Sequence, residues 1–133
     1  MRRRLRHWTG RTAFRWLRRF PRLAHSLLPW IMTHMSFAIP LSKLRETPTL
    51  LAFYHPQPAY PVHILIVPRR AIASLADLDA DDAPLLAEVF QTTQSLVAEL
   101  GLAHRGYRLI VNGGIYQDLP QLHWHLVAED NIQ

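Results

Sequence analysis

Residues 121–127 read QLHWHLV, and this stretch near the C-terminus decides both the fold and the chemistry that we expect. Side chains alternate between the two faces of a strand. One face would carry Leu122, Trp124 and Leu126, and the other Gln121, His123, His125 and Val127. Two histidines two residues apart on one face stand about 6–7 Å from each other. His-x-His alone is shared by metal sites, proton relays and exposed strands, so other features must decide between them.

Three features upstream sharpen the prediction. His63 falls in a second apolar stretch, residues 62–67, which is rich in β-branched residues and predicts a strand. Asn112-Gly113-Gly114 opens a loop that runs into the histidine strand, and glycines there would let backbone N–H groups approach an anion closely. Gln117 lies in the same loop. The sequence therefore predicts a phosphate site beside the histidines.

The rest of the domain predicts an α+β fold, in which a helix covers one face of an antiparallel sheet. Further strands are expected at residues 49–54 and 107–111, with the histidine strand at 121–127. The acidic run 77–82 and Pro84 mark the start of a long helix. Gly101 is a plausible cap where that helix ends, near residue 100.

Composition narrows the class of protein. A chain of 133 residues fits one domain, and it contains no cysteine, which excludes disulfides and thiolate sites. Residues 1–45 hold ten arginines, one lysine and no acidic residue, whereas residues 46–133 hold all ten carboxylates. A basic segment confined to one terminus is typical of an arm, so nucleic acid is not the expected partner.

The N-terminal segment predicts a basic amphipathic helix over residues 1–22, with Trp8, Trp16 and Phe20 opposite the arginines. Such a helix favours an anionic membrane surface. A disordered tail, nucleic acid and a protein partner are the alternatives. Residues 23–42 carry no charge and approach the length of a membrane span, but the polar residues and prolines among them favour a hairpin or a helix packed on the domain. We place the extension at 1–35 and the domain at 36–133.

Residues 36–133 resemble the histidine triad (HIT) family, in particular its Hint-like branch. The family signature is His-x-His-x-His followed by two apolar residues, which 121–127 matches with Gln121 in the first position. Residues 39–40 and 50–53 resemble its opening strands, and 63–70 (HILIVPRR) its strand that begins with His. Residues 100–102, 106–108 and Asn112 follow in the family's order and spacing.

The resemblance implies that His123 attacks the α-phosphorus of a purine nucleotide or nucleotide conjugate, forming a covalent nucleotidyl-histidine that water hydrolyses. It implies that His125 hydrogen-bonds the phosphate or the leaving group, and that His63 and Asn112 line the cleft. A loop at Phe53–Pro56 would approach the ribose and the base. It also implies a homodimer. We expect a cytoplasmic protein without a cofactor, which associates with membranes if residues 1–22 act as an anchor.

Four departures from the family surround this cleft. Gln121 cannot titrate, although it can donate and accept hydrogen bonds. Asp118 stands where the family often has Ser or Thr, and His55 where a ribose-binding Asp is common. Tyr116 replaces a loop glycine. We expect weakened or altered activity from these changes.

Three functions therefore compete. The first is a nucleotidyl hydrolase or transferase that uses His123, with His125, Gln121 and His63 as its other catalytic positions. Asn112, Gln117, Asp118, His55 and Phe53 would bind its substrate. The second is a nucleotide-binding module without turnover. The third is a metal protein with His63, His123 and His125 as zinc ligands. We expect no metal, because no carboxylate follows closely in sequence to orient these ligands.

Overall fold

The computed structural model describes residues 43–129, and residues 1–42 and 130–133 lie outside the described part. The predictions for the arm at 1–22, the uncharged segment at 23–42 and the domain boundary near residue 36 fall mainly on those residues. None of the helices within 43–129 combines the length and apolarity that a membrane crossing needs.

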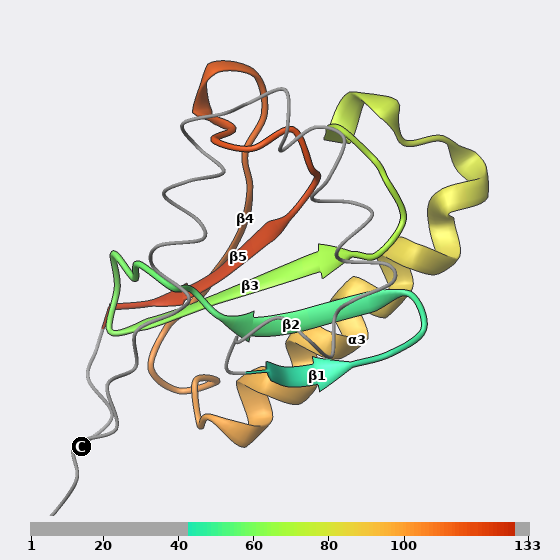
Figure 1. Ribbon diagram of the computed structural model, residues 1–133. Helices are drawn as coiled ribbons and strands as arrows, with labels where there is room; N and C mark the ends of the chain where they lie inside the picture. Colours follow the sequence, from blue (N-terminus) through green and yellow to red (C-terminus); the bar gives the residue numbers. More distant parts are fainter. Residues whose placement is uncertain (1–42, 130–133) are drawn as a thin grey trace, which may run out of the picture.

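A five-stranded antiparallel sheet with one long helix forms the domain, which confirms the predicted α+β class (Figure 1). The strand order is β1-β2-β3-β5-β4. The strands are β1 (Lys43–Glu46), β2 (Leu50–Tyr54), β3 (Val62–Pro68), β4 (Arg108–Val111) and β5 (Trp124–Ala128). Short 3-10 turns lie at η2 (Leu75–Asp77), η3 (Ala80–Asp82) and η4 (Gly114–Tyr116).

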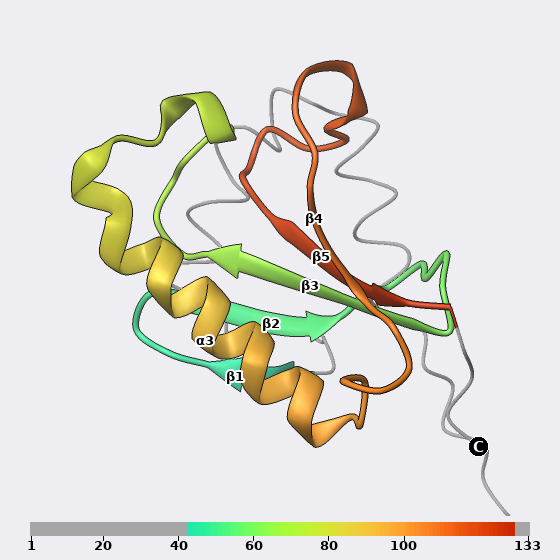
Figure 2. The same cartoon turned by 180° about the vertical axis from the view of Figure 1, so that it is seen from behind.

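The long helix α3 (Ala83–Glu99) packs across one face of the sheet, as Figure 2 shows. Pro84 lies in its first turn, where a missing N–H costs nothing. Gly101 follows its end with a φ of 65°, a conformation that glycine adopts without strain. The core between helix and sheet takes every second residue of the strands, including Ile64, Ile66, Trp124 and Leu126.

One strand and one strand boundary differ from the predictions. The sequence does not predict strand β1, because its residues KLRE show no alternation of apolar and polar side chains. Pairing with β2 is what makes this segment a strand. Strand β5 begins at Trp124, so the prediction that it starts at Gln121 is wrong. Residues 121 and 122 instead hydrogen-bond to the segment that follows β3: the Leu122 N–H donates to the Ile72 carbonyl over 2.7 Å.

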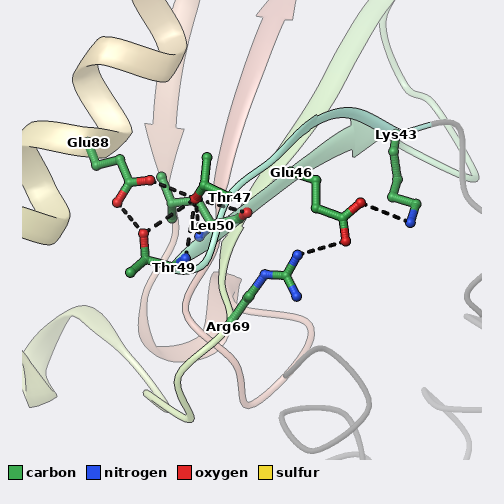
Figure 3. A network of polar contacts seen from close by, with 7 residues as sticks. All are labelled: Lys43, Glu46, Thr47, Thr49, Leu50, Arg69 and Glu88. Carbon is green, nitrogen blue, oxygen red and sulfur yellow. Dashed lines mark hydrogen bonds and ion pairs between the residues drawn. The ribbon is translucent and has the colours of Figure 1, made fainter. Parts of the chain in front are cut away.

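The turn between β1 and β2 is tied to α3 by a polar network (Figure 3). The Thr47 hydroxyl donates to Glu88 over 2.7 Å and accepts from the Leu50 N–H over 2.9 Å. Thr49 donates to the same carboxylate. Arg69, just beyond β3, pairs with Glu46 at 2.8 Å. The two threonine contacts hold the turn between β1 and β2 against α3. The predicted histidines of β3 and β5 lie on the opposite face of the sheet.

Candidate functional site

Two strands place His63 and His125 on the face of the sheet opposite α3. His63 in β3 pairs with Val127, and Leu65 pairs with His125, so the two histidines lie diagonally across neighbouring strands. The Nε2 atom of His63 is 2.9 Å from Nδ1 of His125. A long-range contact thus joins two residues 62 positions apart in sequence.

His55 joins this pair from the loop that follows β2. Its backbone N–H donates to the His63 carbonyl over 2.8 Å, which extends the pairing of β2 and β3 by one residue. Its ring centroid is 4.3 Å from that of His63 and 6.1 Å from that of His125. The structure thus brings His55 together with the predicted histidines.

His123 completes the cluster from just before β5. Its ring centroid is 4.9 Å from that of His125. Its Nδ1 is 2.7 Å from the backbone carbonyl oxygen of Gln121. A carbonyl only accepts hydrogen bonds, so Nδ1 must carry the proton in the neutral ring. The lone pair of neutral His123 therefore lies on Nε2.

Backbone amides set the tautomers of the other rings in the same way. The Ala59 N–H donates to Nδ1 of His63 over 3.0 Å, which places the proton of His63 on Nε2. That proton is donated to Nδ1 of His125, so His125 carries its own proton on Nε2. The Gln57 N–H donates to Nδ1 of His55 over 2.9 Å, with the same consequence.

Burial keeps these imidazoles neutral at pH 7. It lowers the pKa of His55 to about 4, with the neighbouring His125 and His123 adding to the shift and Asp118 opposing it. Burial followed by His55 lowers the pKa of His63 to about 4, and burial followed by His123 and His63 does the same for His125. The pKa of His123 is also lowered by burial, against its bond to Gln121 and the charge of Asp118.

Two predicted site residues, Gln117 and Gln121, use their amide donors inside the protein. Nε2 of Gln121 donates to the carbonyls of Pro68 and Arg70, at 3.1 and 3.0 Å. Nε2 of Gln117 donates to the carbonyls of Ala73 and Leu119, at 2.6 and 2.8 Å. Both N–H bonds of each amide are therefore occupied, and neither amide nitrogen is left to bind a phosphate.

The other predicted binding residues lie on three different parts of the fold. Asn112 is half-buried directly after β4, and Gly114 two residues on has a φ of 57°. Asp118 is exposed, and its charge acts on three of the four histidines. Phe53 is buried within β2, so the loop expected to start there begins after Tyr54.

Sequence reasoning missed the contributions of Ala59 and Tyr60. Ala59 acts through its backbone N–H, for which the residue type gives no signal. The Tyr60 ring meets His63 edge-on, with centroids 5.4 Å apart. Both lie in the proline-rich loop between β2 and β3, and this composition predicted a loop without showing where it folds.

One set of histidines within the described residues is close enough to share a metal ion. It comprises His55, His63 and His125, whose ligand atoms lie within 4.8 Å of one another, and it contains His55 where the sequence suggested His123. A metal at Nε2 of His55 or His63 would require a proton on Nδ1, which would then face a backbone N–H donor. The donor set is suitable, but the tautomers oppose coordination.

Comparisons with known proteins match most of the chain to one family of domains. Residues 36–132 match the sequence model of the HIT domain. A HIT-like protein of Chlamydia pneumoniae is 36% identical over 92 residues, which cover 68% of this chain and 83% of that protein.

Two solved structures share the fold. A HIT family hydrolase from Legionella pneumophila Philadelphia 1 has a TM-score of 0.71 at 31% identity, covering 80% of this chain and 95% of that one. A histidine triad nucleotide-binding protein from Candida albicans has a TM-score of 0.64 at 26% identity, covering 76% and 75%.

Proposed function

The chain belongs to the histidine triad family, and from this premise we propose that it hydrolyses or transfers a nucleotidyl group through a covalent intermediate on His123. The observation that carries the proposal is the bond from Nδ1 of His123 to the Gln121 carbonyl. It leaves the lone pair on Nε2, and the lowered pKa keeps the ring neutral near pH 7. A neutral imidazole with a directed lone pair is a competent nucleophile.

His125 supplies the complementary group. Its Nε2–H follows from the bond that its Nδ1 accepts from His63, and its ring is the neighbour of His123. An N–H donor beside the nucleophile can stabilise charge that develops on a phosphate oxygen or on the leaving atom. His123 and His125 together thus offer one lone pair and one donor, as a phosphoryl-type displacement requires.

The reaction would run in two displacements. Nε2 of His123 forms a bond to the α-phosphorus while the bond to the leaving group breaks, and the leaving group departs with that electron pair and is protonated by solvent. Water then attacks the phosphorus and loses one proton to the solvent, while the electron pair of the N–P bond returns to Nε2 of His123. A different acceptor in place of water would give transfer instead of hydrolysis.

The substrate would be a nucleotide conjugate, with a purine base as the family resemblance implies. His55, His63, Asn112 and Phe53 lie on the elements that would line its site. The exposed carboxylate of Asp118 would repel further negative charge, which favours a leaving group that carries little. Gln117 would act through the loop that its amide holds.

A direct test is to incubate the protein with several nucleoside phosphoramidates and acyl adenylates. The expected result is a mass increase of one nucleotidyl group on the intact protein, which peptide mapping assigns to His123. Free nucleotide should be released at the rate at which the adduct decays. Absence of both adduct and released nucleotide with every conjugate would contradict the proposal.

A second candidate is a nucleotide-binding protein without turnover. One observation favours it: the His55 Nε2–H is a donor where a carboxylate is common in the family. Nucleotide binding in a calorimeter without adduct or release in the same buffer would identify this alternative.

We also propose two interactions of the whole chain. Strand β4 is an edge strand among the described residues, and a second copy could pair with it to form the homodimer that the resemblance implies. Light scattering during size-exclusion chromatography should then give twice the mass of one 15.4 kDa chain. The basic segment 1–22 would bind anionic membranes from the cytoplasmic side.

A further inference from the structure

Gln121 connects the proposed nucleophile, His123, to the end of β3. Its Nε2 donates to the carbonyls of Pro68 and Arg70, at 3.1 and 3.0 Å. The backbone carbonyl of Gln121 accepts a hydrogen bond from Nδ1 of His123 at 2.7 Å. The next residue adds a backbone bond, from the Leu122 N–H to the Ile72 carbonyl at 2.7 Å. Three bonds to the segment 68–72 thus flank the one carbonyl that orients His123.

The side chain of Gln121 costs folding stability at this position. It is 2% exposed, and its Oε1 is buried with no hydrogen-bond partner within residues 43–129. Buried polar atoms without partners are destabilising, so a purely structural position would favour an apolar side chain. Positions that break such a rule are often functional ones. The two donors of the amide are what an apolar side chain would not provide.

We propose that Gln121 is a positioning residue, whose amide holds its own backbone carbonyl where that carbonyl fixes the proton of His123 on Nδ1. This inference rests on the proposed role of His123 as the nucleophile. If the amide is removed, the peptide between Gln121 and Leu122 loses two of its three anchors. The carbonyl can then turn away from Nδ1, and the His123 proton can move to Nε2, where it blocks the lone pair.

The geometry explains why glutamine fits this task. Two carbonyls, of Pro68 and Arg70, are served by the two N–H bonds of a single nitrogen. A neutral imidazole carries one N–H and could serve only one of them. Methionine has a similar length and carries no donor. Gln121→His and Gln121→Met therefore form a graded series with one and zero donors.

The first measurement is the tautomer of His123, read from ring ¹⁵N chemical shifts of the full chain at pH 7. The wild type should show the Nδ1–H form. Gln121→Met should shift the population toward Nε2–H, and Gln121→His should lie between the two. Thr93→Val is the matched control, because it removes a buried hydroxyl bond to the Val89 carbonyl on α3, away from the cluster. It should leave the His123 signals unchanged.

The second measurement is the rate of nucleotidyl adduct formation with a nucleoside phosphoramidate. We expect Gln121→Met to lower kcat by about tenfold or more with KM within about threefold, because a misplaced imidazole proton impairs the chemical step. Gln121→His should lose less. If Gln121→Met does not fold, the tautomer and rate of Gln121→His decide the question.

The outcomes separate this inference from the proposed function. A Gln121→Met protein that keeps the Nδ1–H form and its wild-type rate would overturn the positioning role while leaving nucleotidyl transfer intact. A wild type that forms no adduct and releases no nucleotide would overturn the proposed function, and the ¹⁵N shifts would still show whether Gln121 sets the His123 tautomer. A tautomer unchanged in both variants would then reject the positioning role as well.

Discussion

The Nε2 atom of His63 donates its proton to Nδ1 of His125 over 2.9 Å, and the backbone N–H of Ala59 fixes this direction from the other side of the His63 ring. The two hydrogen bonds form a chain from Ala59 through His63 to His125, and this chain fixes the tautomer of both histidine rings. Its result is an N–H on Nε2 of His125, beside the lone pair of His123. A loop backbone group thus determines which atoms the proposed active site presents.

Replacing His63 by phenylalanine should remove the hydrogen bond to Nδ1 of His125 while a ring of similar size still fills the space. His125 would then populate both neutral tautomers, and its Nε2 would carry a proton in only one of them. We expect kcat on a nucleoside phosphoramidate to fall by about tenfold or more. Steady-state kinetics test this, and the exposed His104→Gln variant is the control. Wild-type kcat in His63→Phe would show that His125 needs no partner.

Replacing His123 by alanine should abolish turnover and adduct formation. The nucleophile acts mainly in the transition state, so nucleotide affinity should stay within about tenfold. Intact-mass spectrometry measures the adduct, and calorimetry measures the affinity of the same variant for a nucleoside monophosphate. An adduct that persists in His123→Ala would move the nucleophile elsewhere in the cluster.

The cluster should make the protein less stable as the pH falls from about 6.5 to 4. Three histidines with a native pKa of about 4 stay neutral in this range, whereas their ordinary pKa of 6.5 lets the unfolded chain bind protons. As the pH falls, the unfolded state binds protons that the native state does not bind, so the free energy of unfolding decreases. Above pH 6.5 this contribution is complete.

Urea unfolding at a series of pH values measures this effect. One pKa unit corresponds to about 1.4 kcal/mol, so we expect a total loss of about 2 kcal/mol or more after allowing for partial exposure. His55→Asn should flatten the dependence, because it removes one of the three groups. Thr93→Val, which removes no titratable group, should leave the pH dependence unchanged. A flat profile in the wild type would contradict the burial of the cluster.

The parts of the fold that sequence predicted are those with local signals. Strand β3 is an apolar run between prolines, and α3 follows an acidic run and has Pro84 in its first turn. The histidines were located because an alternating strand and a family pattern both marked them. Their grouping with His55 needed the register of three strands, which the sequence does not contain.

The misplaced parts depend on tertiary contacts. Gln121 was assigned to the histidine strand by extending the alternation of residues 124–127, but hydrogen bonds to Pro68 and Arg70 hold it outside β5. Strand β1 exists because β2 offers an edge for it, and its charged sequence gives no periodic signal. In both cases a partner far along the chain overrides the local pattern.

Metal removal should leave nucleotide binding and any hydrolysis unchanged. The histidines that lie close enough for a shared ion, His55, His63 and His125, have tautomers set by donors that compete with coordination. Prolonged dialysis against a chelator, followed by metal analysis and the phosphoramidate assay, checks this. Stoichiometric zinc in the purified protein, with activity that is lost and restored with the metal, would favour the metal function instead.

The basic arm, residues 1–22, has a charge opposite to that of the domain and should bind anionic membranes. Each arginine held near an anionic bilayer contributes about 1 kcal/mol, and burial of Trp8, Trp16 and Phe20 would add a part that salt does not screen. The full chain should therefore co-sediment with anionic vesicles, less with neutral ones, and partly resist high salt. A chain that begins at Ser36 should stay in the supernatant with its nucleotide affinity unchanged.

The acidic domain is the rival partner for the arm: binding there would leave the full chain in the supernatant with both kinds of vesicle. If removal of residues 1–35 unfolds the domain, the predicted boundary is wrong.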